Sequence, residues 1–171
     1  CTDKSVVLLG IGTNQIRKIE TNHDFTINIY ALEDQIVKDI ASGATPFCIV
    51  GNAGTVNTGA VDDLLALSRI AKKYRMWFHV DGAYGGLVSS LPSLKHLYAG
   101  MENADSIALD FHKWLYQPFE IGCVLVRGWN ILRETYFKQA DYLDTGLEKG
   151  NTRLEFNEHY FQLSRNAKAF K

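Results

Sequence analysis

The chain has 171 residues, of which 46% are hydrophobic and 22% are charged, and its formal net charge is −1. This length and composition fit one globular domain, and the small net charge argues against a basic surface for nucleic acid or an anionic membrane. No apolar run approaches the ~20 residues of a membrane span, and we expect neither a signal peptide nor a membrane partner.

The cysteines indicate a reducing compartment. Cys1, Cys48 and Cys123 are widely spaced and odd in number, so they match neither a disulfide framework nor a CxxC metal site. We expect reduced core thiols in a cytoplasmic protein. The chain starts without a methionine, and residues 164–171 resemble a helix that has just begun, so we expect a fragment of a longer protein.

Short apolar runs alternate with amphipathic segments along the chain. In chain order we expect a helix end at 5–9, a strand at 15–19, a helix at 31–41, a strand at 47–50, a helix at 61–74, and strands at 76–80, 106–109 and 122–126. Continuous apolar strands separated by helices predict an α/β fold, with a mostly parallel sheet and helices on both faces. In such sheets ligands bind at the carboxyl ends of the strands.

Polar or glycine-rich segments follow three of these strands, at residues 51–59, 81–86 and 110–113. Asp81 ends a strand, and a carboxylate at the mouth of a buried sheet is costly unless a cation meets it. Lys113 lies between aromatic residues, where lost hydration favours its neutral, nucleophilic amine. An amine that forms an imine with an aldehyde, and a carboxylate that keeps a pyridine nitrogen protonated, are what pyridoxal 5′-phosphate (PLP) requires.

Two runs carry a resemblance to a known family. FHVDGAY at 78–84 and ADSIALDFHKWL at 104–115 resemble the core of the group II PLP-dependent amino-acid decarboxylases. Residues 53–62 are similar to that family's glycine-threonine turn, and 161–165 to its downstream serine- or glycine-arginine segment. The resemblance implies the large domain of PLP fold type I, like aspartate aminotransferase, with a homodimer and the decarboxylation of an L-amino acid to an amine and carbon dioxide. Residues 1–130 would form the PLP-binding core, and 131–171 the mobile catalytic loop and the start of the next helix.

The resemblance also implies a role for each matching residue. Lys113 would be the Schiff-base lysine, and Asp81 would pair with the pyridinium nitrogen. The other expected cofactor and catalytic contacts are Ala83 against the ring face, Ser106 and His112 at the phosphate (or, for His112, the substrate), Thr55 in the glycine-threonine turn, and Tyr142, which helps protonate the carbanion after carbon dioxide leaves. His79 would either contact these residues without touching the cofactor or be an ordinary strand histidine. No metal is implied.

The sequence departs from the family at three places. Asp110 stands where many members have asparagine near the phosphate, and a carboxylate there would repel a phosphate unless it turned away. Val56 replaces a second threonine. Residues 1–5 lack the ring-stacking histidine of the family, which we expect upstream together with the main phosphate loop.

Other functions remain open on the sequence alone. His79, Asp81 and His112 are metal-ligand types, which allows a metal-dependent hydrolase. A binding module would leave Lys113 as a surface charge. An aminotransferase or a cysteine desulfurase of the same fold would use Asp81 and Lys113 equally well, so decarboxylation is favoured by the HKW run at 112–114 and by Tyr142. The amino acid used as substrate is not identified.

Overall fold

The computed structural model describes residues 2–119, 121–128, 130–138 and 156–164. It divides into two units, Cys1–Leu125 and Val126–Lys171, and each is described by itself. No helix in these described ranges is both long and apolar enough to cross a membrane.

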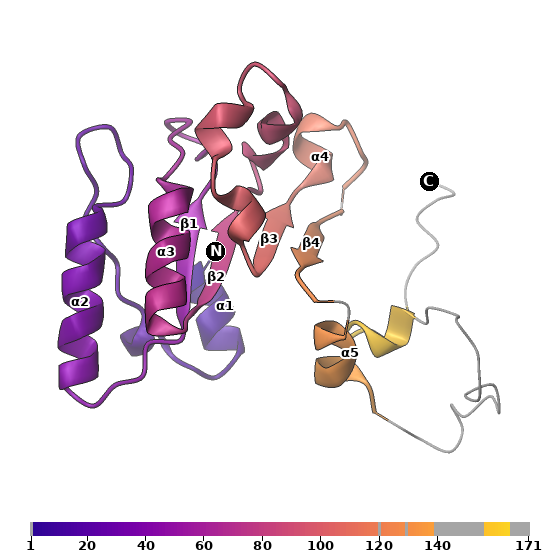
Figure 1. Ribbon diagram of the computed structural model, residues 1–171. Helices are drawn as coiled ribbons and strands as arrows, with labels where there is room; N and C mark the ends of the chain where they lie inside the picture. Colours follow the sequence, from indigo (N-terminus) through magenta and orange to yellow (C-terminus); the bar gives the residue numbers. More distant parts are fainter. Residues whose placement is uncertain (1, 120, 129, 139–155, 165–171) are drawn as a thin grey trace. The chain divides into compact units, whose positions relative to one another are not determined.

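The first unit is organised around a sheet with the strand order β1-β2-β3-β4 (Figure 1). The strands are β1 (Cys48–Asn52), β2 (Trp77–Asp81), β3 (Ser106–Leu109) and β4 (Cys123–Val126). β1 pairs with β2, and β2 with β3, both in parallel. Because the carboxyl ends of parallel strands meet at one edge, the segments that follow β1, β2 and β3 emerge together, and the mostly parallel sheet expected from the sequence is confirmed.

Two capped helices flank this sheet. Helix α2 (Ile29–Ala41) begins after Asn28, whose side chain accepts a hydrogen bond from the Ala31 amide at 3.0 Å. Helix α3 (Leu64–Tyr74) begins after Asp63, which accepts from the Ala66 amide at 2.9 Å. These caps explain why α2 starts two residues before the expected position and α3 three residues after it. In Figure 1 both helices stand on the same side of the sheet.

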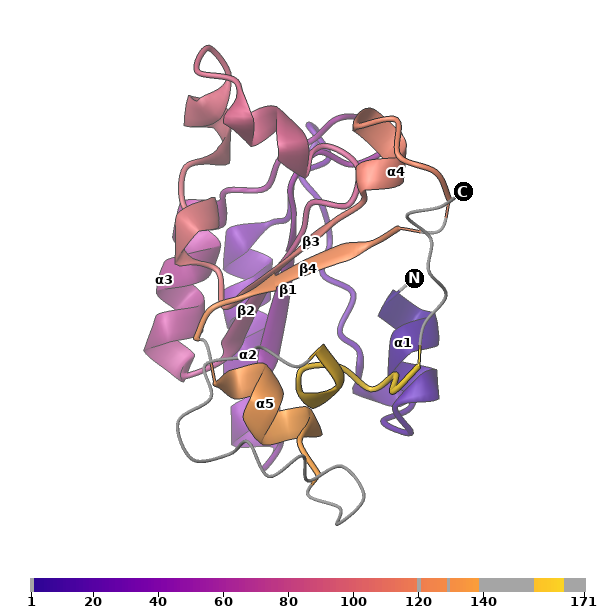
Figure 2. The ribbon, with the colours of Figure 1, turned by 90° about the vertical axis from the view of Figure 1, so that its right-hand side faces the viewer.

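The alternation of side chains along β2 separates a core face from a half-buried face. Phe78 and Val80 are buried, whereas Trp77, His79 and Asp81 are half-buried. A Cβ added at Gly51 would meet Leu64, Leu67 and Phe78, which shows that Phe78 lies against α3. His79 and Asp81 therefore face away from α3. Figure 2 shows the ribbon of the strands and of α3 after a turn of 90°.

The expected strand at 15–19 is wrong. Residues Thr13–Gln15 form a 3-10 turn, and residues 16–20 have no regular structure. Side chains hold this segment, since Arg17 Nε lies 3.0 Å from Asp39 and Lys18 Nζ lies 2.7 Å from Asp3. The helix end expected at 5–9 is confirmed as the end of α1 (Thr2–Leu8). The other expected strands are present with shifts of at most two residues at an end.

The described part of the second unit contains α5 (Ile131–Tyr136) and a short 3-10 turn at Phe156–Glu158. Arg133 joins them, because its Nε lies 2.7 Å from Glu158 Oε2. The Arg133 guanidinium also lies over the Phe137 ring, at 4.3 Å from the ring centroid. The ion pair ties a helix residue to a turn residue that lies 25 positions later in the sequence.

A buried carboxylate stabilises the turn that follows β1. Asp62 is only 4% exposed, and its two oxygens accept the backbone amides of Ile27 and Asn52, each at 2.7 Å. Asp62→Ala would leave both amides without this partner, so we expect the full-length protein to lose about 3 kcal/mol of unfolding free energy. Urea denaturation measures this loss. Asp24→Ala, which removes an exposed turn carboxylate bonded to Thr26, is the control, and equal midpoints for the two variants would contradict this role.

Candidate active site

Asp81 lies at the carboxyl end of β2, where the sequence places it. Its Oδ1 accepts a hydrogen bond from the Ala83 amide at 3.1 Å. The Gly82 amide donates to the Ala108 carbonyl of β3 at 3.0 Å. A Cβ at Gly82 would lie 3.0 Å from the Gly86 Cα, so this turn leaves little room for a side chain there. The turn therefore fixes the carboxylate at the edge of the sheet.

Lys113 lies in a short helix, α4 (Phe111–Trp114), that follows β3. The segment after β3 contacts the segment after β2: the Asp110 amide donates to the Ala83 carbonyl at 3.3 Å. The rings of Tyr84 and Trp114 meet edge to face, with 5.4 Å between their centroids. The structure thus brings the Asp81 turn and the Lys113 helix together.

The third segment, after β1, packs on the same turn. The Gly85 amide donates to the Gly54 carbonyl at 3.0 Å, and a Cβ at Gly85 would lie 2.5 Å from the Gly54 Cα. Gly54 also has a φ of +83°, which favours glycine. The next residue, Thr55, is half-buried, and its Oγ1 lies 2.6 Å from Thr58 Oγ1. This close backbone approach places the expected glycine-threonine turn beside the segment that carries Ala83.

Asp110 forms an ion pair with Lys113. The Lys113 Nζ lies 2.8 Å from Asp110 Oδ2, and both side chains are partly exposed. The carboxylate that replaces the family's asparagine is therefore directed toward the candidate lysine. The His112 Nε2 lies 3.9 Å from the same oxygen.

His112 is oriented by its other ring nitrogen. Its Nδ1 lies 2.7 Å from the Ile121 carbonyl, which only accepts hydrogen bonds, so Nδ1 is the donor. The ring also stacks on Phe119, with 4.5 Å between centroids. These contacts leave Nε2 for a ligand or substrate.

Ser106 has contacts that favour a role other than phosphate binding. It is buried, and its Oγ lies 2.8 Å from Trp77 Nε1 and 2.7 Å from His79 Nδ1. Its expected donation to a phosphate stays a prediction that these contacts do not favour. Burial lowers the pKa of His79, while the Asp81 carboxylate acts in the opposite direction. Sequence reasoning missed Trp77; its signal was the spacing of two residues before His79, on the same face of a strand.

Several expectations receive no support or lie outside the described residues. Tyr142 is outside them, as is Arg165. Within the described ranges, no three His, Cys, Asp or Glu side chains gather as metal ligands would, so nothing supports a site of His79, Asp81 and His112.

The thiols of Cys48 and Cys123 are less acidic than usual. Burial raises the pKa of the Cys48 thiol, and the Asp105 charge adds a smaller effect in the same direction. Burial also raises the pKa of the Cys123 thiol.

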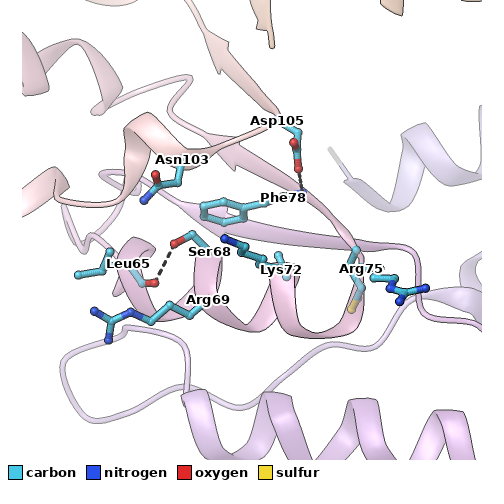
Figure 3. Close-up of a pocket in the computed structure, with 10 residues that line it drawn as sticks. Leu65, Ser68, Arg69, Lys72, Arg75, Phe78, Asn103 and Asp105 are labelled. Carbon is cyan, nitrogen blue, oxygen red and sulfur yellow. Dashed lines mark hydrogen bonds between the residues drawn. The ribbon is translucent and has the colours of Figure 1, made fainter. Parts of the chain in front are cut away.

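A cavity of about 470 Å³ lies elsewhere, along α3 (Figure 3). Arg69 and Lys72 of the helix and Arg75, which follows it, line this cavity, and Asp105 lies across from them. Asp105 also accepts a hydrogen bond from the Phe78 amide at 2.8 Å. None of the candidate site residues lines this cavity. The candidate site is therefore the edge of the sheet at which the carboxyl ends of β1, β2 and β3 meet (the strand edge), not this cavity.

Comparison with known proteins gives matches over nearly the whole chain. A model of the pyridoxal-dependent decarboxylase conserved domain matches residues 1–171. An aromatic-L-amino-acid decarboxylase of Bacillus atrophaeus is 37% identical over 99% of this chain and 35% of its own length. A 4-hydroxyphenylacetaldehyde synthase of Rhodiola rosea is 32% identical over 98% of this chain and 34% of its own length. The chain thus spans about a third of the length of these curated relatives.

A solved structure gives the same result. Oryza sativa TDC with PLP and tryptamine superposes with a TM-score of 0.87 at 27% identity, covering 95% of this chain and 34% of that one. This likeness confirms the expected fold class, the α/β large domain of PLP fold type I. Together with the match over residues 1–171, it shows that the chain belongs to the pyridoxal-dependent decarboxylase family.

Proposed function

We propose that the full-length protein uses PLP to decarboxylate an L-amino acid to an amine and carbon dioxide. The observation that carries this proposal is the meeting of the Asp81 turn and the Lys113 helix at one strand edge, in a chain of the pyridoxal-dependent decarboxylase family. We propose aromatic L-amino acids as substrates, since the Bacillus atrophaeus relative is an aromatic-L-amino-acid decarboxylase and the rice structure contains tryptamine.

The residues at this edge fit PLP. Asp81 receives the Ala83 amide on Oδ1, and among the described residues no hydrogen bond reaches its Oδ2. That oxygen can accept a hydrogen bond from the protonated ring nitrogen of PLP. The Lys113 side chain is one-third exposed, so its amine is within reach of an aldehyde. Ala83 offers a side chain small enough to lie under a flat ring.

Each residue then has a distinct task. When bound, PLP supplies the electron sink that accepts the electrons of the breaking bond to the carboxylate. Asp81 keeps the proton on the ring nitrogen, and Lys113 holds the cofactor through its amine between turnovers. His112 presents Nε2 to the phosphate or the substrate carboxylate. We propose Tyr142, outside the described residues, as the group that delivers the proton to the substrate Cα.

The ion pair between Asp110 and Lys113 predicts slow capture of the cofactor. Lys113 must leave Asp110 before its amine reacts, and an exposed pair of this kind contributes about 0.2–1 kcal/mol. For Asp110→Asn in the cofactor-free full-length protein we expect capture of PLP that is about 1.4- to 5-fold faster. Stopped-flow visible absorbance measures this rate. Asp34→Asn, which breaks an ion pair with Lys38, is the control, and an unchanged or slower rate for Asp110→Asn would contradict the prediction.

The products distinguish the proposed function from its competitors. The full-length protein is incubated with a panel of aromatic, acidic and diamino L-amino acids, and the products are identified by mass spectrometry. Amines with equimolar carbon dioxide support decarboxylation. Keto acids from every substrate would show an aminotransferase instead, and aldehydes would show an activity like that named for the Rhodiola rosea relative.

Two further proposals concern the whole protein. We propose a homodimer, which the family resemblance implies, and sedimentation velocity of the full-length protein measures it. We also propose a cytoplasmic location. The cysteines Cys48 and Cys123, both free thiols in the described part of the chain, support it, because free thiols are typical of a reducing compartment.

A further inference from the structure

Three side chains on the face of the sheet away from α3 form a continuous hydrogen-bonded chain. Trp77 and His79 are two residues apart on β2, and Ser106 lies beside His79 in the register with β3. The Ser106 Oγ lies 2.8 Å from Trp77 Nε1 and 2.7 Å from His79 Nδ1. Asp81 is the next residue of β2 on the same face. The hydrogen-bonded chain therefore runs from the Trp77 indole through Ser106 to the His79 imidazole, which is next to Asp81 on this face of β2.

The donors and acceptors in this chain fix the tautomer of His79. An indole nitrogen only donates, so Ser106 Oγ accepts from Trp77. Residue Ser106 is 7% exposed, and the hydrogen-bond acceptor for its hydroxyl among the described residues is His79 Nδ1. A buried hydroxyl hydrogen without an acceptor is costly. All three groups are satisfied when His79 Nδ1 carries no hydrogen, which places the imidazole proton on Nε2.

Protonation of His79 would break this arrangement. An imidazolium has a hydrogen on Nδ1, which would face the hydroxyl hydrogen of Ser106 and leave that hydrogen without an acceptor. The surroundings act in two directions: burial favours the neutral ring, and the Asp81 carboxylate favours the charged one. The neighbours on the flanking strands, Val50 and Ser106, carry no charge. Asp81 is thus the charged group whose attraction the hydrogen-bonded chain has to offset.

We propose that Ser106 and Trp77 are positioning residues that hold His79 as a neutral, Nε2-protonated imidazole, so that the Asp81 charge is kept for the cofactor. The last step of this inference rests on the proposed function, because it takes the pyridinium nitrogen as the partner of Asp81. A positive His79 would compete for the same carboxylate and would repel the ring cation. A neutral His79 does neither, so the Asp81 carboxylate is left to pair with the ring nitrogen.

The tautomer is measured without turnover. The cofactor-free full-length protein is labelled with ¹⁵N in its histidine rings, and the His79 signals are assigned by their loss in His79→Gln. In the wild type we expect a protonated Nε2 and an unprotonated Nδ1 at neutral pH. In Ser106→Ala we expect His79 to become charged at a higher pH than in the wild type. Ser106→Thr, which keeps a hydroxyl, should restore the wild-type titration, and Ser89→Ala, which removes a hydroxyl bonded to the Gly86 carbonyl, should leave it unchanged.

The link to the cofactor has a separate readout. A raised His79 pKa means that the ring is charged below that pKa, so Ser106→Ala should lose turnover on the acid side and recover it at higher pH. The wild type should lack this acid limb. An Nδ1-protonated or charged His79 in the wild type at neutral pH would overturn the proposal, as would an unchanged titration in Ser106→Ala.

A second variant covers the case in which Ser106→Ala does not fold. In Trp77→Phe the Ser106 hydroxyl loses the donor that orients it toward His79 Nδ1, so His79 should become charged at a higher pH than in the wild type. A His79 titration in Trp77→Phe that is identical to that of the wild type would overturn the role of the indole. A protein that shows the expected tautomer but makes no amine from any amino acid would contradict the proposed function instead, so the two failures are distinguishable.

Discussion

Asp81→Ala is expected to reduce turnover by about 10²-fold or more while the full-length protein stays folded. The carboxylate stabilises the positive charge on the ring nitrogen, and that charge is what draws electrons from the breaking bond. The fold should survive because, among the described residues, the half-buried Asp81 side chain accepts one hydrogen bond, from the Ala83 amide. Steady-state product formation by mass spectrometry and far-UV circular dichroism measure the two parts of this expectation.

Two further variants serve as comparisons for Asp81→Ala. Asp81→Asn keeps the shape of the side chain and an oxygen for the Ala83 amide but removes the charge, so it should lose nearly as much turnover as Asp81→Ala. Asp34→Ala removes a carboxylate from an exposed helix position and should leave turnover unchanged. Turnover within tenfold of the wild type in Asp81→Ala would mean that the carboxylate only holds its turn.

Lys113→Ala is expected to abolish both turnover and the imine absorption band of bound PLP. The amine of Lys113 is the group proposed to hold the cofactor, and alanine offers no nucleophile at this position. Weak binding should remain, because His112 and the turn around Ala83 are still in place. Absorbance spectra and equilibrium dialysis with PLP, both on the full-length variant, separate lost attachment from lost binding.

Lys95→Ala is the control for this variant, since Lys95 is an exposed lysine of a 3-10 turn, Lys95–Tyr98. It should retain the yellow colour and the activity of the wild type. Lys113→Arg adds a second comparison, because arginine keeps the charge and the contact with Asp110 but cannot act as an amine nucleophile. Visible absorption of wild-type strength in Lys113→Arg would contradict the assignment.

The strand edge was predictable from the sequence because the signals that define it are local. Continuous apolar runs end at Asp81 and just before Asp110, and the parallel arrangement follows from their alternation with helices. Once those strands are adjacent and parallel, their ends must meet, so the approach of the Asp81 turn and the Lys113 helix follows. The close approach of Gly54 and Gly85 needed the structure, but the glycines themselves marked both turns.

The contacts between strands were not predictable in the same way. The hydrogen bonds of Ser106 with Trp77 and His79 cross 27 to 29 residues and depend on the register of β2 against β3, which no local pattern fixes. The error at residues 15–19 has a related cause. A short segment forms a strand only if a neighbouring strand supplies its hydrogen bonds, and this segment is held instead by side chains such as Arg17, which contacts Asp39.

The most direct test of the account is the identity of the lysine that carries PLP. The full-length holoprotein is treated with borohydride, which reduces the bond between the cofactor and the amine to a stable one, and is then digested and mapped by tandem mass spectrometry. The account predicts a single modified peptide, with the reduced cofactor on Lys113. A reduced cofactor on Lys72, Lys73 or Lys95, or none on Lys113, would contradict it.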